Sequence, residues 1–219
     1  MKTVAQSVEE IIKRKPFLES ALAQGIINMT SLAKDILPSV VDDLKKDVNQ
    51  GAIVMAIKRL APTLEFQINH KVRGVLSNLG DITVRSKLAD YTFSVSDTLI
   101  KNQSRFLEMV GAHPDLYYAV SRGVYETTIV ISDRFQEEVE SIFGNEIIIS
   151  KKTGLSSLTI KLPEENSKVA GIYYYIFRDL AWEGINVLEV ISTTNEFTII
   201  VDDNQVEKAF RLLKTLGNQ

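Results

Sequence analysis

The chain of 219 residues contains no cysteine and two histidines, His70 and His113. The lack of cysteine excludes disulfides, zinc–thiolate sites, iron–sulfur clusters and a cysteine nucleophile, and it is the usage expected in a reducing cytoplasm. Neither histidine belongs to a metal-binding spacing such as His-Glu-x-x-His. We therefore expect a cytoplasmic protein without a metal site.

The sequence also lacks the glycine-rich phosphate loop, the Gly-x-Gly-x-x-Gly dinucleotide motif and the Gly-x-Ser-x-Gly nucleophile motif. Adjacent carboxylates such as Asp42 and Asp43 fall in stretches typical of solvated helix faces. Acid–base catalysis by two carboxylates needs burial that such positions do not offer. We expect a protein that is not an enzyme and that uses no cofactor.

Long apolar runs are missing as well. Runs such as residues 147–149 are far shorter than the roughly 18 residues of a membrane span. Residues 1–6 lead into a charged helix rather than into the apolar core of a secretion signal. We expect no membrane association.

Charge is modest, with a net value of −3, and it differs between the two ends of the chain. Residues 1–75 carry 11 basic and 8 acidic residues, a net +3, while residues 76–219 carry 14 and 20, a net −6. A change of sign can mark a nucleic-acid-binding end. Three excess positive charges over this length are nevertheless well below the dense basic stripe that phosphate binding usually needs.

The hydrophobic pattern changes its period along the chain. Residues 7–60 place apolar side chains at helical spacing, whereas from residue 82 onward the pattern alternates as in strands. Residues 82–150 predict the order strand-helix-strand-strand-helix-strand, and residues 157–216 repeat it without the last strand. We predict an α+β protein with a helical domain (1–75) and two ferredoxin-like βαββαβ units (76–152 and 153–219).

One motif stands out in the second repeat. Gly171 is followed by Ile172, Leu180 lies nine positions after Gly171, and Gly184-Ile185-Asn186 follows. This spacing resembles the ACT domain, a ligand-sensing module, in the paired form found at the end of aspartate kinases. The resemblance implies that the second unit binds an amino acid near the helix entrance, through the residues Ser167, Lys168, Val169, Ala170, Gly171, Ile172 and Asn186.

The resemblance has further implications for the pair of units. ACT pairs of the aspartate-kinase type share strands, so residues 146–150 are expected to supply the strand that the second unit lacks. Residues 97–111 contain no glycine at the helix entrance, and we expect the first unit to be structural. The resemblance also implies a homodimer formed through the ACT units.

Two N-terminal segments, residues 25–34 and 51–60, extend the resemblance to archaeal proteins that are predicted regulators of amino-acid metabolism with an ACT domain. In a helix-turn-helix interpretation, residues 30–37 would support a recognition helix at 50–60, with Gln50, Lys58 and Arg59 as the DNA-contacting candidates. The dozen residues between these helices, which include Pro38, argue against a tight motif. The apolar Val54 and Met55 fit a protein contact better.

The sequence therefore predicts a non-catalytic regulator of amino-acid metabolism that senses a small ligand, an amino acid, and reports to DNA or to a protein partner. Three interpretations stay open: a transcription regulator, a free-standing regulatory subunit that binds and controls a metabolic enzyme, and a purely structural protein.

Overall fold

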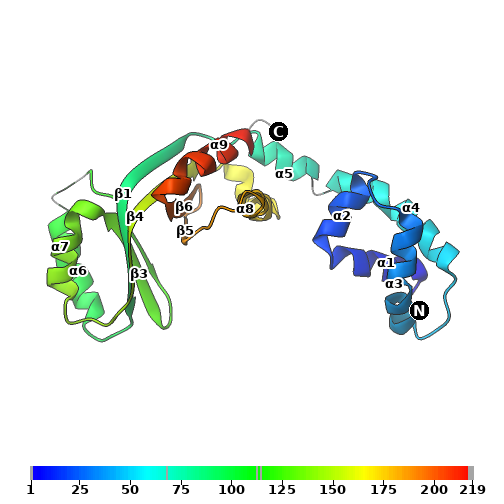
Figure 1. Ribbon diagram of the computed structural model, residues 1–219, viewed down its shortest axis with the longest axis horizontal. Helices are drawn as coiled ribbons and strands as arrows, with labels where there is room; N and C mark the ends of the chain where they lie inside the picture. Colours follow the sequence, from blue (N-terminus) through cyan, green and yellow to red (C-terminus); the bar gives the residue numbers. More distant parts are fainter. Residues whose placement is uncertain (1, 68, 112, 114, 217–219) are drawn as a thin grey trace. The chain divides into compact units, whose positions relative to one another are not determined.

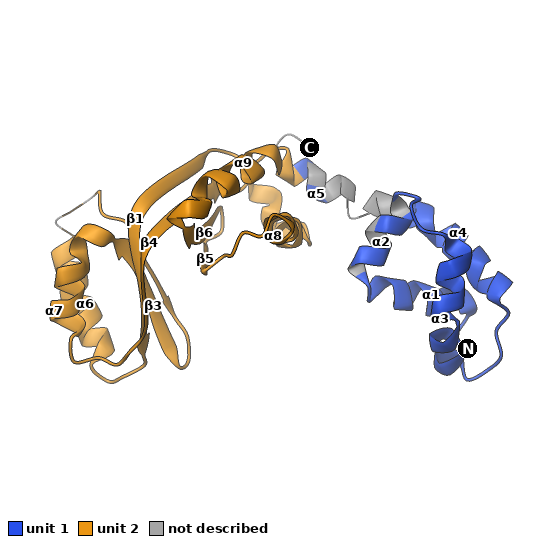
Figure 2. Ribbon diagram, in the orientation of Figure 1, with its two compact units in different colours: residues 1–74 blue, residues 75–219 orange. Residues whose placement is uncertain are grey.

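The computed structural model describes residues 2–67, 69–111, 113 and 115–216. The chain divides into two compact units, Met1–Gly74 and Val75–Gln219 (Figures 1 and 2). Unit 1 consists of helices, and unit 2 is an antiparallel sheet with helices.

Unit 1 contains α1 (Val4–Lys13), α2 (Pro16–Ala23), α3 (Met29–Leu44) and α4 (Gln50–Gln67), and α5 (Asn69–Leu76) runs across the boundary between the units. Apolar side chains at spacings of three and four residues give α1, α3 and α4 one buried face each. These faces meet in a common core that includes Val8, Ile12, Leu32, Ile36, Val40, Ile53 and Ile57.

Pro38 does not end its helix, contrary to the sequence-based expectation. It lies inside α3, which continues to Leu44. Proline removes one backbone hydrogen bond, but Ile36 and Val40 on either side are buried in the core and hold the helix in place. Only residues 45–49 separate α3 from α4, so the predicted interval of a dozen residues is wrong.

The sheet of unit 2 has the strand order β2-β3-β1-β4-β6-β5, and all neighbouring strands are antiparallel. The strands are β1 (Ile82–Ser94), β2 (Tyr118–Arg122), β3 (Glu126–Ser132), β4 (Ile148–Lys161), β5 (Glu189–Ser192) and β6 (Glu196–Asp202). The helices are α6 (Leu99–Val110), α7 (Gln136–Phe143), α8 (Ile172–Trp182) and α9 (Val206–Leu216), and the short turns are η1 (Asp133–Phe135), η2 (Glu164–Lys168) and η3 (Asp203–Gln205).

Two long strands, β1 and β4, run through both halves of this sheet (Figure 1). The later part of β1 pairs with β3, and residues 82–85 at its start pair with residues 157–160 of β4, which also pair with β6. Residues 82–85 therefore supply the fourth strand of the second half. The prediction that residues 146–150 do so is wrong, because Ile148 and Ser150 pair with Phe93 and Thr92 in the first half.

The junction between the halves has a specific local geometry. The register of β1 against β4 shifts between Arg85 and Leu88, and Lys87 there has a φ of 58°. Such a bulge bends a strand and increases its twist, which lets β1 leave one half and enter the other. The predicted border between residues 152 and 153 falls inside the continuous strand β4.

The two halves repeat individual interactions. The hydroxyls of Thr92 and Thr128 lie 3.1 Å apart in the first half, and those of Thr159 and Thr198 lie 2.7 Å apart at the matching cross-strand position of the second. Apolar residues of β1 and β3 pack against α6 and α7 in the first half, with Tyr91, Phe93, Phe106, Ile129 and Phe143 among the buried members. Side chains from one face of the sheet thus build the core with the helices.

Candidate functional site

A hollow of about 670 Å³ lies at the entrance of α8. Of the predicted ligand residues, Ser167, Val169, Ala170, Gly171 and Ile172 line it, together with Asn166, Tyr173, Tyr174, Thr193 and Thr194. Lys168 is exposed on η2, and Asn186 is exposed after Gly184; neither lines the hollow. The backbone N–H of Asn186 donates instead to the Gln205 side chain (3.2 Å).

Gly171 shapes the helix entrance. Its φ of 100° and ψ of −5° lie in the left-handed region, where a side chain would be strained. No side chain caps α8 at this described position, and the first N–H groups of a helix have no partner within it. Free N–H groups and the positive end of the helix dipole together attract anions. The geometry is suited to a carboxylate.

Hydrogen bonds hold together the part of the hollow that is formed by η2 and the turn between β5 and β6. Asn166 Nδ2 donates to the carbonyls of Pro163 (2.7 Å) and Thr194 (2.9 Å), which ties η2 to the turn between β5 and β6. The N–H of Leu162 donates to the carbonyl of Asn195 (2.7 Å) at the same turn. This turn brings Thr193 and Thr194 into the lining, and sequence reasoning missed them. The Thr-Thr-Asn run between two predicted strands was their only signal.

The tyrosines of α8 point in different directions. The Tyr173 hydroxyl lies 3.0 Å from Ser192 Oγ, and its ring lies 5.1 Å from that of Phe197. The Tyr175 ring instead lies under the guanidinium of Arg178 (4.6 Å). Tyr174 is 40% exposed and lines the hollow. Glu164 and Glu165 on η2 are exposed beside the exposed Lys168, so the segment leading to the hollow carries charges of both signs.

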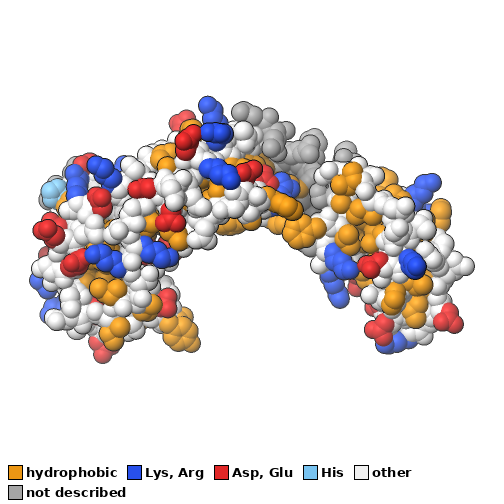
Figure 3. Space-filling view, viewed as in Figure 1, with side chains coloured by type: hydrophobic (Ala, Val, Ile, Leu, Met, Phe, Trp, Pro, Cys, Tyr) orange, Lys and Arg blue, Asp and Glu red, His pale blue; other side chains and the backbone are white. Residues whose placement is uncertain are grey.

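The DNA-binding candidates on α4 differ in their surroundings. Gln50 is half-buried, and its Nε2 donates to the carbonyl of Thr30 (3.1 Å), which fastens α4 to α3. Lys58 and Arg59 are exposed, and Met55 is 50% exposed on the same helix. On the face shown in Figure 3, the described basic, acidic and apolar side chains of unit 1 are interspersed.

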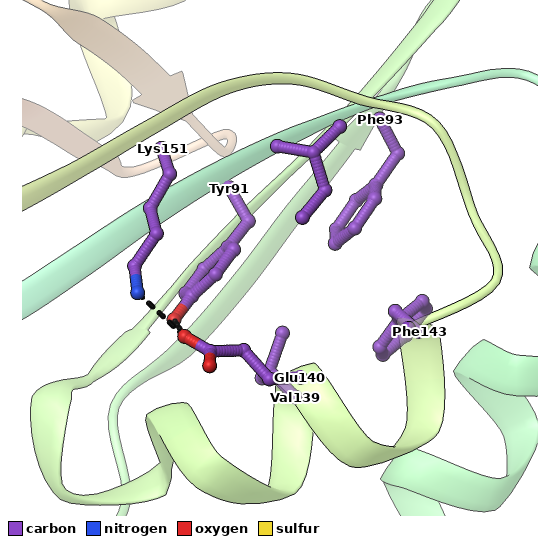
Figure 4. A pocket seen from close by; sticks show the side chains of 8 residues that line it. Tyr91, Phe93, Val139, Glu140, Phe143 and Lys151 are labelled. Atoms are coloured by element: carbon purple, nitrogen blue, oxygen red, sulfur yellow. Dashed lines mark hydrogen bonds and ion pairs between the residues drawn. The ribbon is translucent and has the colours of Figure 1, made fainter.

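A second hollow, of about 300 Å³, lies in the first half of the sheet between β1, α7 and β4. Figure 4 shows Tyr91, Glu140 and Lys151 converging at one side of it. Glu140 accepts from the Tyr91 hydroxyl (3.2 Å) and from Lys151 Nζ (2.5 Å). Lys151 therefore lowers the pKa of Glu140, Glu140 raises that of Lys151, and burial raises that of Tyr91. The rest of the lining is mainly apolar.

Asp90 is the most unusual acid of the sheet. It lies on β1 between Val130 and Lys152 and is 4% exposed. Burial raises its pKa from 3.8 to about 6, and the nearby Glu189 adds to the rise, while Lys152 and a hydrogen bond with Thr92 oppose it. Within the described residues, no group of three or more His, Asp or Glu side chains is placed to hold a metal ion.

Comparisons with known proteins find matches to solved structures but none to family models or curated sequences. No family model and no curated protein matches the sequence. The regulatory subunit of aspartate kinase from Thermus thermophilus, in a ligand-free form, matches with a TM-score of 0.51 and 11% identity over 63% of this chain and 97% of that chain. A structure of aspartokinase alpha and beta subunits matches with a TM-score of 0.53 and 15% identity over 64% and 99%.

The aspartate kinase of Clostridium acetobutylicum, described as an allosteric enzyme, matches with a TM-score of 0.51 and 15% identity over 62% of this chain and 34% of its own. At such identities the likeness concerns the fold: the chain shares the arrangement of helices and antiparallel sheet found in regulatory subunits of aspartate kinase.

No helix in the described part of the chain combines the length and apolar character needed to cross a membrane.

Proposed function

We propose that this chain is a non-catalytic regulator that senses an amino acid at the entrance of α8. In this proposal unit 2 is a pair of ferredoxin-like ACT units, residues 76–152 and 153–219, with residues 82–85 as the fourth strand of the second, and it follows a helical domain at residues 1–75. The shared fold with aspartate-kinase regulatory subunits supports the assignment. Both halves of the sheet also have the same strand order, in which the first and third strands are central.

The hollow at α8 is the observation that carries the proposal. Its volume of about 670 Å³ falls within the range of small-molecule sites. The ligand carboxylate would accept from the N–H groups at Ile172 and Tyr173, where the helix dipole favours negative charge. Ser167, which lines the hollow, would contact the polar end of the ligand, and Lys168 and Asn186, which do not line it, stay predicted ligand residues.

A thermal-shift screen over the twenty amino acids tests the proposal. An amino acid at 100 times its dissociation constant should add roughly 2.7 kcal/mol to the free energy of unfolding. Ala170→Glu places a carboxylate in the hollow and should abolish the shift by repulsion and by filling space. Ala181→Glu, at an exposed position near the other end of α8, is the matched control and should keep it. A flat screen with the wild-type protein contradicts the proposal.

The regulator could act on DNA or on an enzyme, and a different observation favours each target. The exposed Lys58 and Arg59, on a helix joined to α3 by a short connection, favour a transcription regulator that binds DNA. The likeness to separate regulatory subunits favours the alternative, a free-standing subunit that forms a homodimer through its ACT units and controls a metabolic enzyme. Salt-sensitive DNA binding in a mobility-shift assay that responds to the amino acid supports the first. Stable co-purification with one enzyme supports the second.

A further inference from the structure

The first half of the sheet contains a buried carboxylate at the start of α6, the first helix of that half. Glu146 is 8% exposed and lies just before β4. Its oxygens accept hydrogen bonds from Ser96 Oγ (2.5 Å), Thr98 Oγ1 (2.8 Å) and Asn102 Nδ2 (2.7 Å). Burial alone would raise the pKa of Glu146, but these three hydrogen bonds outweigh burial and lower it. The carboxylate is thus ionised and enclosed by donors from the turn and first part of α6.

The position of Glu146 has a defined equivalent in the second half. At the end of β1, the N–H of Ser94 donates to the carbonyl of Ile147 (2.9 Å). At the end of β4, the N–H of Lys161 donates in the same way to the carbonyl of Asp81 (3.1 Å). The residue before Ile147 is Glu146, and the residue before Asp81 is Gly80. Glycine stands where the first half has its carboxylate.

A side chain at this place in the second half would be crowded. A Cβ atom on Gly80 would lie 3.0 Å from Cβ and 3.3 Å from the carbonyl oxygen of Lys161. The connection to the helix also differs, because residues 95–98 join β1 to α6 whereas the longer segment 162–171 joins β4 to α8. The first half therefore has a short turn filled by Glu146, and the second has a long turn that surrounds the hollow at Gly171.

We propose that Glu146 is a built-in carboxylate that occupies, in the first half, the place where the second half receives the carboxylate of a ligand. In the half that contains α6, Glu146 itself fills the carboxylate position, so the chain binds one carboxylate ligand rather than two. Removal of the Glu146 side chain opens a site for a small carboxylate among Ser96, Thr98 and Asn102. The stoichiometry rests on the proposed function, whereas the opened site does not.

Glu146→Ala with acetate tests the opened site. The substitution removes a CH2–COO⁻ group, and acetate supplies a carboxylate with one carbon attached. We expect the variant to have a lower Tm than the wild type and sodium acetate to raise it by at least about 2 °C over sodium chloride at equal ionic strength. The wild type and Glu183→Ala, which removes an exposed glutamate, offer acetate only the hollow at α8 and should gain less. If the variant is unfolded in chloride, acetate should restore the folded protein.

A second variant separates occupancy from mere loss of stability. Glu146→Gln keeps the shape and fills the space, so it should lose stability and gain no more from acetate than the wild type does. Equal responses of Glu146→Ala and the wild type to acetate, or failure of acetate to refold an unfolded Glu146→Ala, overturns the proposal. The acetate response should persist in Glu146→Ala combined with Ala170→Glu, because the hollow at α8 takes no part in it.

Calorimetric titration with the amino acid found in the screen tests the stoichiometry. One site per chain is expected, and two sites contradict the proposal that Glu146 fills the carboxylate position. A flat amino-acid screen combined with a positive acetate response would refute the amino-acid sensor and leave the role of Glu146 intact. The two proposals therefore fail separately.

Discussion

The replacement Asp90→Asn should stabilise the protein, and the gain should grow with pH. Asp90 is 4% exposed, and its folded-state pKa of about 6 exceeds the ordinary 3.8 because burial disfavours the charged form. An acid whose pKa is raised by folding contributes to the free energy of unfolding. This contribution is fully present below the pKa of the unfolded state and is lost as the pH rises through the pKa of the folded state. Asparagine carries no charge at any of these pH values.

The size of the effect follows from the shift. About two pKa units correspond to at most roughly 3 kcal/mol above neutral pH, with any solvent access to the carboxylate reducing it. At about pH 5 the unfolded carboxyl is already ionised while the folded one is still protonated, so roughly half of this cost is present. Between about pH 5 and pH 8 the wild type should therefore lose stability relative to Asp90→Asn, by up to about 1.4 kcal/mol because water near the carboxylate screens its charge.

Urea unfolding of the two proteins at both pH values measures this difference. Glu189 and Lys152, the charged groups that face Asp90, are the same in both proteins, so the difference between them isolates position 90 to a first approximation. Asp97→Asn, at an exposed position in the turn before α6, is the control and should follow the wild type. A stability difference between Asp90→Asn and the wild type that is the same at both pH values would refute the reasoning.

Three further changes test the packing and the backbone. Phe93→Ala removes a fully buried ring that stacks on Phe143 (5.0 Å) and should cost about 3–5 kcal/mol in urea unfolding; a cost below that of an ordinary surface substitution contradicts the core described above. Pro38→Ala restores a backbone donor inside α3 and should stabilise unit 1 by about 2 kcal/mol, measured as a rise in Tm. Lys87→Gly relieves a left-handed residue in β1 and should raise the Tm of unit 2 by an amount equivalent to about 1 kcal/mol; a lower Tm would show that the bulge is unstrained.

Local features were readable from the sequence, and pairing between distant segments was not. The periods of 3.6 and 2 gave the helices and strands of unit 2 close to their observed places, for example α6 at Leu99–Val110 and β6 at Glu196–Asp202. Residues 82–85 and 146–150 show the same alternation, however, and alternation does not say which strand a segment joins. The pattern alone therefore predicts the wrong segment as the fourth strand of the second half.

The candidate site was readable only in part, for a similar reason. The glycine at position 171 marked the helix entrance, because few other residues adopt its backbone conformation. Asn166, Thr193 and Thr194 reach the hollow through contacts between segments about 28 residues apart, and composition alone gives no sign of them. The sequence pattern predicts Glu146 as the first residue of a strand and gives no sign of its burial, because that burial depends on donors at positions 96, 98 and 102.

Because β1 and β4 each belong to both halves, neither half is a separable piece of protein. A fragment that starts at residue 153 would lack both residues 82–85 and the earlier part of β4, and its sheet would present an unpaired edge to other chains. Truncation, duplication or gene fusion can therefore preserve this sheet only by carrying both halves together. The pair should also unfold in a single cooperative step, so that a disturbance at one helix entrance is felt across the whole sheet rather than in one half of it.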